Sequence, residues 1–219
     1  KIMYRIPRID CNVACPASLE EAFARTVRET VACNNWPADF PYAPQVGFRI
    51  FHTGADLLLR FDIAERCTAA RTLDDNGPVW TDSCAEFFFR PEGSDSYYNF
   101  ECNCIGTLLV GHRRDRTQAE HAPAEVLRTV RRRATYPHAP LPETEGDNRW
   151  TLTLAIPAAA LFRDRIAGWD GVQGAMNLYK CGDDLSCPHY LSWRPVGTPA
   201  PDFHRPEFFE PVFFEPKKQ

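Results

Sequence analysis

Alternation of apolar and polar residues, rather than helical spacing, dominates this sequence. The clearest case is the segment 77–104, where two aromatic-rich runs, 79–90 and 97–104, flank a breaker sequence at 91–96. Side chains of a strand alternate between its two faces. One face of the first run carries Ala85, Phe87 and Phe89, and one face of the second carries Tyr98, Phe100, Cys102 and Cys104. The segment therefore predicts a β-hairpin with one face in a hydrophobic core.

Similar short runs recur along the rest of the chain. They lie at 4–9, 46–52, 57–63, 150–157, 175–180, 189–193 and 212–214. Turn signals rich in glycine and proline separate them, and no strand–helix–strand rhythm is present. Roughly ten strands of this kind predict an all-β fold, a two-sheet antiparallel β-sandwich. No linker divides the chain, so residues 1–219 are expected to form a single domain.

Two segments have helical character. Ser18 and Glu21 form a capping-box pattern before apolar residues at helical spacing, which predicts a helix over 19–32. A second, short helix is predicted near 123–133, within a basic and proline-dotted region at 111–147. We interpret that region as a solvated insertion, because acids intervene between its arginines. Both helices are expected at the periphery of the sandwich.

Charge and hydropathy narrow the range of partners. The net charge of -4 gives no general attraction to nucleic acid or to anionic membranes. No run is long and apolar enough to span a bilayer. We therefore expect no nucleic-acid partner and no membrane insertion. The chain starts at Lys1, which is compatible with removal of a leader.

The nine cysteines are an odd number, so at least one thiol is unpaired within the chain. Cys181 and Cys187 could close a small loop by a disulfide, whereas Cys102 and Cys104 are expected to pack as small hydrophobes. No C-x-x-C pair is present, so no structural metal is predicted. The paired acids at 74–75 and 183–184 could offer oxygen ligands to calcium, but solvated acids are the commoner case and no cofactor is assigned.

The polar face of the 77–104 hairpin carries the candidate chemistry. Glu86, Asn99 and Glu101 share it, and Trp80 stands at its entrance. One interpretation is the solvated side of an antiparallel sheet. The other is a ligand site, because indole faces stack on sugar rings while carboxylates and amides bond their hydroxyls. Trp36 is interpreted as a core plug rather than as a further ring of this site.

Five segments, in order, resemble the family 9 carbohydrate-binding modules and the single-domain proteins like them. They are Trp80–Phe88, Tyr97–Glu101, Trp150–Pro157, Tyr190–Trp193 and Asp202–Phe209. The resemblance implies a jelly-roll-like sandwich of the kind shared with DOMON domains. It also implies non-catalytic binding of mono- or oligosaccharides, including polysaccharide chain ends, and favours an extracellular or periplasmic location. Within the fourth segment, alternation with Leu191 assigns Trp193 to the core.

The resemblance also implies an aromatic clamp on a sugar ring. Trp80 takes the place of its first tryptophan and Glu86 that of its ligand carboxylate. Phe203 stands where the family has a second tryptophan, and Glu101 where it has an arginine. His204 and Arg205, next to Phe203, complete the expected ligand-binding set of Trp80, Glu86, Asn99, Glu101, Phe203, His204 and Arg205.

Two other functions remain open from the sequence. Glu86 and Glu101 could act as the paired carboxylates of a glycoside hydrolase or lyase, since adjacent strands would hold them on one face. Haem binding between a methionine and a histidine is the less favoured alternative. The chain has only Met3 and Met176 for that purpose, and Met176 is expected in the core.

Overall fold

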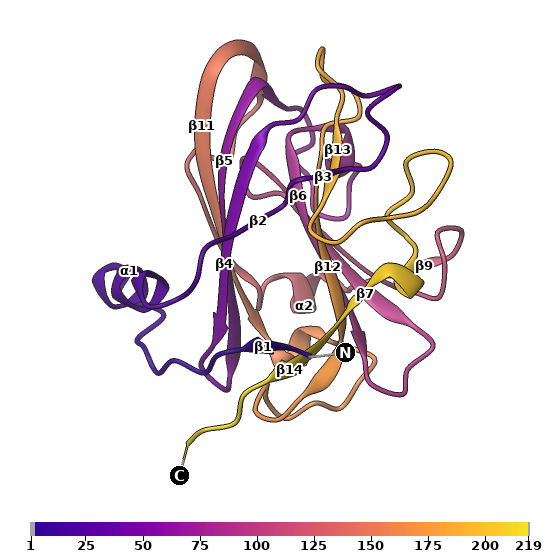
Figure 1. Ribbon diagram of the computed structural model, residues 1–219. Coiled ribbons are helices and arrows are strands. Elements are labelled where there is room, and N and C mark those ends of the chain that lie inside the picture. The colour runs from indigo at the N-terminus through magenta and orange to yellow at the C-terminus, as the bar shows by residue number, and fades with distance from the viewer. Residues whose placement is uncertain (1–2, 219) are drawn as a thin grey trace.

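The computed structural model describes residues 3–218, and their strands form two sheets packed face to face (Figure 1). The larger sheet has the order β1 (Tyr4–Ile6), β14 (Glu210–Phe214), β12 (Gln173–Cys181), β6 (Cys84–Pro91), β7 (Tyr97–Asn103), β8 (Leu108–Arg113) and β9 (Ala119–His121). In addition, β13 (Tyr190–Ser192) pairs with β12 and with β3 (Cys33–Asn34). The smaller sheet has the order β10 (Arg131–Ala134), β11 (Leu141–Pro157), β5 (Asp56–Ala70), β4 (Gln45–His52) and β2 (Glu29–Thr30).

The predicted all-β, two-sheet sandwich is confirmed, with one exception in strand direction. The pairs within the sheets are antiparallel apart from β1 and β14, which run parallel with Tyr4 opposite Val212.

The helical elements are short: α1 (Pro16–Ala24), α2 (Ala124–Leu127), and the single turns η1 (Val79–Thr81), η2 (Ala158–Ala160) and η3 (Pro206–Phe208). Within residues 3–218, no helix has the length and apolar character needed to cross a membrane.

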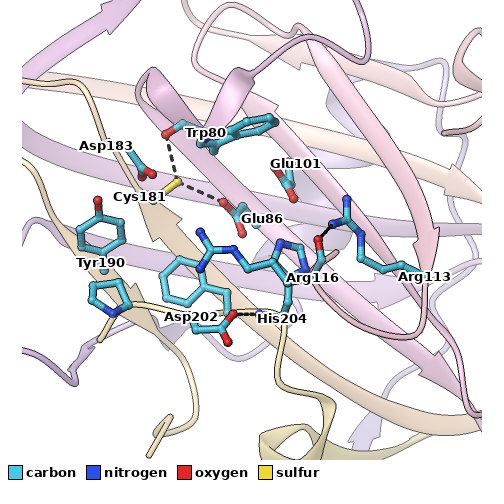
Figure 2. A pocket seen from close by; sticks show the side chains of 12 residues that line it. Trp80, Glu86, Glu101, Arg113, Arg116, Cys181, Asp183, Tyr190, Asp202 and His204 are labelled. Carbon is cyan, nitrogen blue, oxygen red and sulfur yellow. Dashed lines mark hydrogen bonds between the residues drawn. The ribbon is translucent and has the colours of Figure 1, made fainter. Parts of the chain in front are cut away.

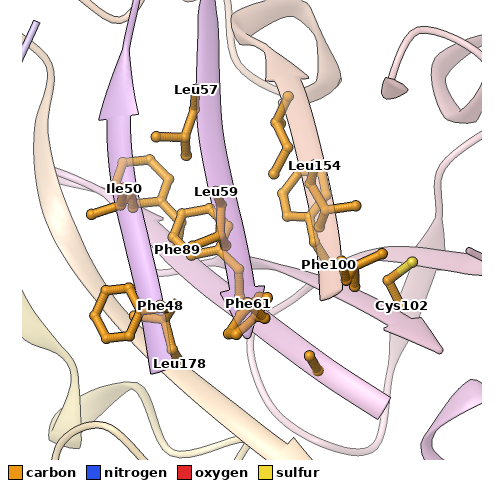
Figure 3. Packing of buried hydrophobic residues seen from close by; sticks show 14 of the residues in the cluster. Phe48, Ile50, Leu57, Leu59, Phe61, Phe89, Phe100, Cys102, Leu154 and Leu178 are labelled. Atoms are coloured by element: carbon orange, nitrogen blue, oxygen red, sulfur yellow. The ribbon is translucent and has the colours of Figure 1, made fainter. Parts of the chain in front are cut away.

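The core lies between the two sheets, where side chains of both inner faces interdigitate (Figure 3). The smaller sheet contributes Phe48, Ile50, Leu57, Leu59, Phe61 and Leu154, and the larger contributes Phe89, Phe100, Cys102 and Leu178. Cys102, Met176 and Trp193 are buried in this cluster, as the sequence predicted. Packing of β-branched, aliphatic and aromatic residues in such a dry layer is the main source of stability in a sandwich.

The predicted hairpin is the centre of the larger sheet. Its two strands, β6 and β7, pair with Glu86 opposite Glu101 and Phe88 opposite Asn99. Because alternate residues face opposite ways, Phe87 and Phe100 point into the core while both glutamates point outward. The hairpin thus places its polar residues together on the outer face.

A buried ion pair links the two sheets. Nζ of Lys180, in β12, lies 2.7 Å from Oε2 of Glu65, in β5. The ammonium also donates to the carbonyl of Cys181 at 2.8 Å and to Nε2 of His189 at 2.7 Å. Trp150 Nε1 donates to the other carboxylate oxygen of Glu65 at 2.7 Å. Burial and the neighbouring ammonium hold the pKa of His189 well below its usual value, so the ring accepts from Lys180 as neutral imidazole.

The first helix is shorter than predicted. It begins at Pro16, whose fixed φ suits a first turn, and Ser18 lies inside it with its hydroxyl accepting from Asn12 N–H. After Ala24 the chain turns into β2, and Val31 N–H donates to the carbonyl of Val46 in β4. Pairing with the sheet therefore replaces the second half of the predicted helix.

The second predicted helix is also truncated. Its region is mostly exposed, as predicted, but it supplies strands to both sheets and is therefore not an insertion. The helix α2 ends at Leu127, and 131–134 form the edge strand β10 beside β11. Leu127, Val130 and Ala122 are buried in the main core. These three apolar residues of the region therefore belong to the core between the sheets.

Candidate functional site

The outer face of the larger sheet is covered, so the interpretation of it as a solvated face is wrong. A second apolar cluster lies over it, formed by Trp36, Val79, Cys84, Phe88, Tyr97, Leu109, Ala175, Tyr179, Cys181, Val196, Phe203 and Phe209. The chain after β13 crosses this face, as the ribbon shows (Figure 1). Glu86 and Glu101 are only 3% and 4% exposed beneath this cover.

A cavity of about 240 Å³ opens beside this cluster. Its lining mixes rings with charged groups: Trp80, Glu86, Glu101, Arg113, Arg116, Cys181, Asp183, Tyr190, Pro201, Asp202, Phe203 and His204. Ligand pockets for drug-sized molecules are roughly 300–1,000 Å³, so this cavity suits a compact, polar ligand. In Figure 2 the indole of Trp80 lies above Glu86 and Glu101.

Trp80 is the exposed ring of the cavity. It is 38% exposed, whereas the other tryptophans of the chain are buried. Its turn, η1, is fixed by Asp82, whose carboxylate accepts from the N–H groups of Arg71 and Thr72 and from the amide of Asn103. On the opposite side, Trp80 O accepts from Asp183 N–H at 3.2 Å. These hydrogen bonds fix the backbone of Trp80, and the backbone in turn places the indole at the cavity.

The two cavity glutamates have raised pKa values. Burial raises the pKa of Glu101 to about 7, and burial together with the negative charge of Glu101 raises that of Glu86 well above its usual value. Cys181 donates its thiol hydrogen to Glu86 Oε1 at 3.0 Å. At the rim, burial and the adjacent Asp184 raise the pKa of Asp183 to about 6. Glu86 and Glu101 can therefore both donate and accept hydrogen bonds near neutral pH, whereas Asp183 mainly accepts.

An arginine from the neighbouring strand partly balances these acids. Arg113, at the end of β8, donates from Nε to Asn99 Oδ1 at 2.9 Å, and Asn99 Nδ2 donates to Glu101 Oε1 at 2.8 Å. A side chain at Gly111 would collide with Asn99, since its Cβ would lie 2.6 Å from Asn99 Oδ1. Asn99 itself is fully buried and does not line the cavity. It positions Glu101 and Arg113 instead.

Phe203 and His204 form the opposite wall. Phe203 is 8% exposed and stacks on Tyr179 with ring centroids 4.2 Å apart and planes at 14°. His204 Nδ1 shares a hydrogen bond of 2.9 Å with the hydroxyl of Tyr97. Burial, with Arg113 and Arg116 nearby, lowers the pKa of His204 to about 3, so its ring is neutral. Arg205 does not line the cavity, because its guanidinium pairs with Glu207.

This arrangement of an exposed indole over buried polar groups agrees with a comparison of the sequence with protein families. The model described as Carbohydrate-binding family 9 matches residues 15–214. The chain belongs to carbohydrate-binding family 9. No curated protein matches this family 9 chain at a significant level.

Solved structures agree with this assignment. A protein from Bacteroides uniformis ATCC 8492, provisionally described as carbohydrate-binding, is 39% identical, with a TM-score of 0.91 over 96% of this family 9 chain and 98% of its own. A family 9 module from Caldicellulosiruptor kristjanssonii in complex with glucose has 8% identity and a TM-score of 0.62, covering 98% and 97% of the two chains. The same organism's module with cellotriose has 8% identity and a TM-score of 0.56, covering 99% and 95%. At 8% identity these two show a common fold.

Several cavity residues of this family 9 protein were not predicted from the sequence. Arg113 and Arg116 belong to the segment interpreted as an insertion, and Tyr190 was assigned only to a strand. The alternation of side chains along β8 could have predicted the position of Arg113. It places Arg113 on the same face of the sheet as Asn99 and Glu101. Arg116 lies in a loop, where alternation gives no direction.

The suggested disulfide of the family 9 protein is wrong, because all nine cysteines are free thiols. Cys181 lies at the cavity, whereas Sγ of Cys187 accepts a hydrogen bond from Arg66 Nη2 at 2.7 Å in a separate cluster.

The two acid pairs that were considered as calcium ligands, at 74–75 and 183–184, lie in different environments. Asp75 pairs with Arg132 at 2.7 Å, while Asp183 lines the cavity.

Replacing Glu101 with glutamine should remove part of the pH dependence of stability. The folded-state pKa of about 7 exceeds the usual 4.5, so between these values the folded state binds more protons than the unfolded state. Wild-type stability then falls as pH rises through this window, by about 2–3 kcal/mol from this group. Glutamine keeps an acceptor for Asn99. Urea unfolding at pH 5 and pH 8 should therefore give a smaller loss for Glu101→Gln, and identical losses would contradict the shifted pKa.

Proposed function

We propose that this protein binds carbohydrate without transforming it, and that the cavity beside Trp80 is the binding site. The observation that carries the proposal is the exposed indole above buried carboxyl groups in a family 9 chain. An indole face covers the apolar C–H face of a pyranose, while polar groups around it exchange hydrogen bonds with the ring hydroxyls.

The proposed sugar stacks on Trp80 and bonds the groups below and beside it. Glu86, Glu101 and His204 offer acceptors and donors at the floor and wall, and Arg113 and Asp183 offer charged partners. Phe203 contributes a packed ring to the wall, with one of its faces stacked on Tyr179. The clamp inferred from the family is therefore asymmetric, with one free ring face and one packed ring.

Glucose and cellotriose are the first ligands to test, because family 9 structures with the same fold hold them. The test is calorimetric titration with these sugars alongside a wider glycan screen. Saturable binding with a stoichiometry of one supports the proposal. Absence of binding to any glycan in the screen would reject it.

Replacing Asp183 with asparagine should weaken that binding about tenfold. A hydrogen bond to a charged group is worth about 1.5–3 kcal/mol, and about 1.4 kcal/mol corresponds to a tenfold change in Kd. Asp183 N–H keeps its bond to Trp80 O in the variant, so the turn is not disturbed. Calorimetry at pH 8, where the carboxyl is ionised, measures the effect. Asp147→Asn, an exposed acid remote from the cavity lining, is the matched control.

The second candidate function is a glycoside hydrolase that uses Glu86 and Glu101. Their cross-strand pairing and raised pKa values favour it, because an acid held protonated near neutral pH can serve as a general acid. Membership of a binding family argues against it. Turnover of aryl glycosides that disappears in Glu86→Gln and Glu101→Gln would establish the enzyme.

A further inference from the structure

Two thiols and a carboxyl group lie close together at and just beneath the cavity lining. Cys84 in β6 lies directly opposite Cys181 in β12, and Glu86 follows two residues after Cys84 on the same face. The two sulfur atoms and a carboxylate oxygen of Glu86 all lie within 4.8 Å of one another. Figure 2 shows the Cys181 thiol directed at Glu86. Within residues 3–218, this is the one group of three potential metal donors that lie so close together.

These cysteines are placed differently from the cysteines of the core. Cys102 and Cys104 point between the sheets among aliphatic and aromatic side chains. Cys84 and Cys181 instead point outward, toward a carboxyl group and a cavity that Cys181 itself lines. A small hydrophobe would fill those two positions equally well, but it would not supply a sulfur donor beside Glu86.

We infer that Cys84, Cys181 and Glu86 form a binding site for a thiophilic divalent cation of the Zn²⁺ class. Zinc takes cysteine sulfur at about 2.3 Å and carboxylate oxygen at about 2.0–2.2 Å in tetrahedral geometry, which places two sulfur ligands about 3.8 Å apart. Donors that already lie within 4.8 Å of one another need to move by only about an ångström to reach this spacing.

Three protein donors leave the fourth position of the metal open toward the cavity. Two of the three, Glu86 and Cys181, line the cavity wall, so a water molecule can reach that position. Hard cations such as Ca²⁺ prefer oxygen ligands and are disfavoured here.

Binding of the cation is coupled to proton release, so its affinity should rise with pH. Metal binding replaces the two thiol protons and the carboxyl proton, which are released to solvent. The occupied site then holds three anionic ligands around a doubly charged cation, instead of three buried protonated groups.

The test is a titration of the reduced, chelator-treated protein with Co²⁺, which reports thiolate ligands by charge-transfer absorption and tetrahedral geometry by its visible bands. We expect both features to saturate at one equivalent and to disappear when Zn²⁺ is added. Cys84→Ser/Cys181→Ser should lose them, and Glu86→Gln should weaken Co²⁺ binding at least tenfold. The measurement needs no sugar, so its outcome is separate from that of the proposed function.

The second thiol pair provides the matched control. Cys67 and Cys187 lie together in a different cluster, where the two thiols share a hydrogen bond. Cys67→Ser/Cys187→Ser should keep both absorption features. The inference is overturned if wild type shows no thiolate band, or if the band survives in Cys84→Ser/Cys181→Ser. If that double variant does not fold, unchanged Co²⁺ affinity of the isosteric Glu86→Gln would overturn it equally.

Discussion

Trp80→Ala is expected to lower the affinity for the bound sugar about 30-fold. Removing a central aromatic residue from a binding site commonly costs about 2 kcal/mol, which is a factor of about 30 in Kd. The indole is 38% exposed, and its turn is fixed by the backbone contacts of Asp82 rather than by the ring. Stability should therefore change by less than about 1 kcal/mol. Calorimetric titration and urea unfolding of the variant measure the two quantities separately.

Two further variants sharpen this experiment. Trp80→Phe keeps a smaller ring face and should retain an intermediate affinity. Leu73→Ala removes an apolar side chain of similar exposure, 37%, which does not line the cavity, and it should bind as wild type does. Equal affinity of Trp80→Ala and wild type would place the sugar elsewhere on the molecule.

Lys180→Met is expected to cost about 3–5 kcal/mol of unfolding free energy. The substitution removes the cation that lies 2.7 Å from Glu65 and leaves that carboxylate between the sheets without it. The nearly isosteric methionine leaves no cavity of note, so the loss reports electrostatics rather than packing. Urea unfolding at pH 7, followed by tryptophan fluorescence, provides the measurement.

The double variant Lys180→Met/Glu65→Gln should recover most of that loss. Glutamine is neutral and keeps an acceptor for Trp150 Nε1, so no uncompensated buried charge remains. Arg149→Met breaks an exposed pair with Asp147 and should cost less than about 1 kcal/mol. A double variant as unstable as Lys180→Met alone would rule out the uncompensated carboxylate as the cause.

The strands could be predicted from the sequence because their cause is local. Alternation from Ala85 to Phe89 and from Tyr98 to Cys102 identified the inner face of the central hairpin, since a strand places every second residue on one side. Trp193 was likewise assigned correctly to the core, whereas Trp36 is buried in the second cluster, next to the cavity residue Phe203. The helix boundaries were less predictable, because pairing of β2 with β4 replaces helical hydrogen bonds after residue 24.

The environment of the candidate site could not be predicted, because distant segments create it. Glu86 and Glu101 have the sequence context of a solvated face, and they are buried only because the segment around Phe203 crosses above them. Arg116 reaches the cavity from a loop, and Cys181 meets Cys84 through strands almost a hundred residues apart. Such contacts depend on topology, which the local pattern of polar and apolar residues does not specify.

The stack of Phe203 on Tyr179, together with the hydrogen bond between His204 and Tyr97, fixes the cavity wall before any ligand arrives. Because this wall is already ordered, binding does not carry the entropic cost of immobilising a loop. Association should then proceed without a slow rearrangement, and differences in affinity among sugars should appear in their residence times.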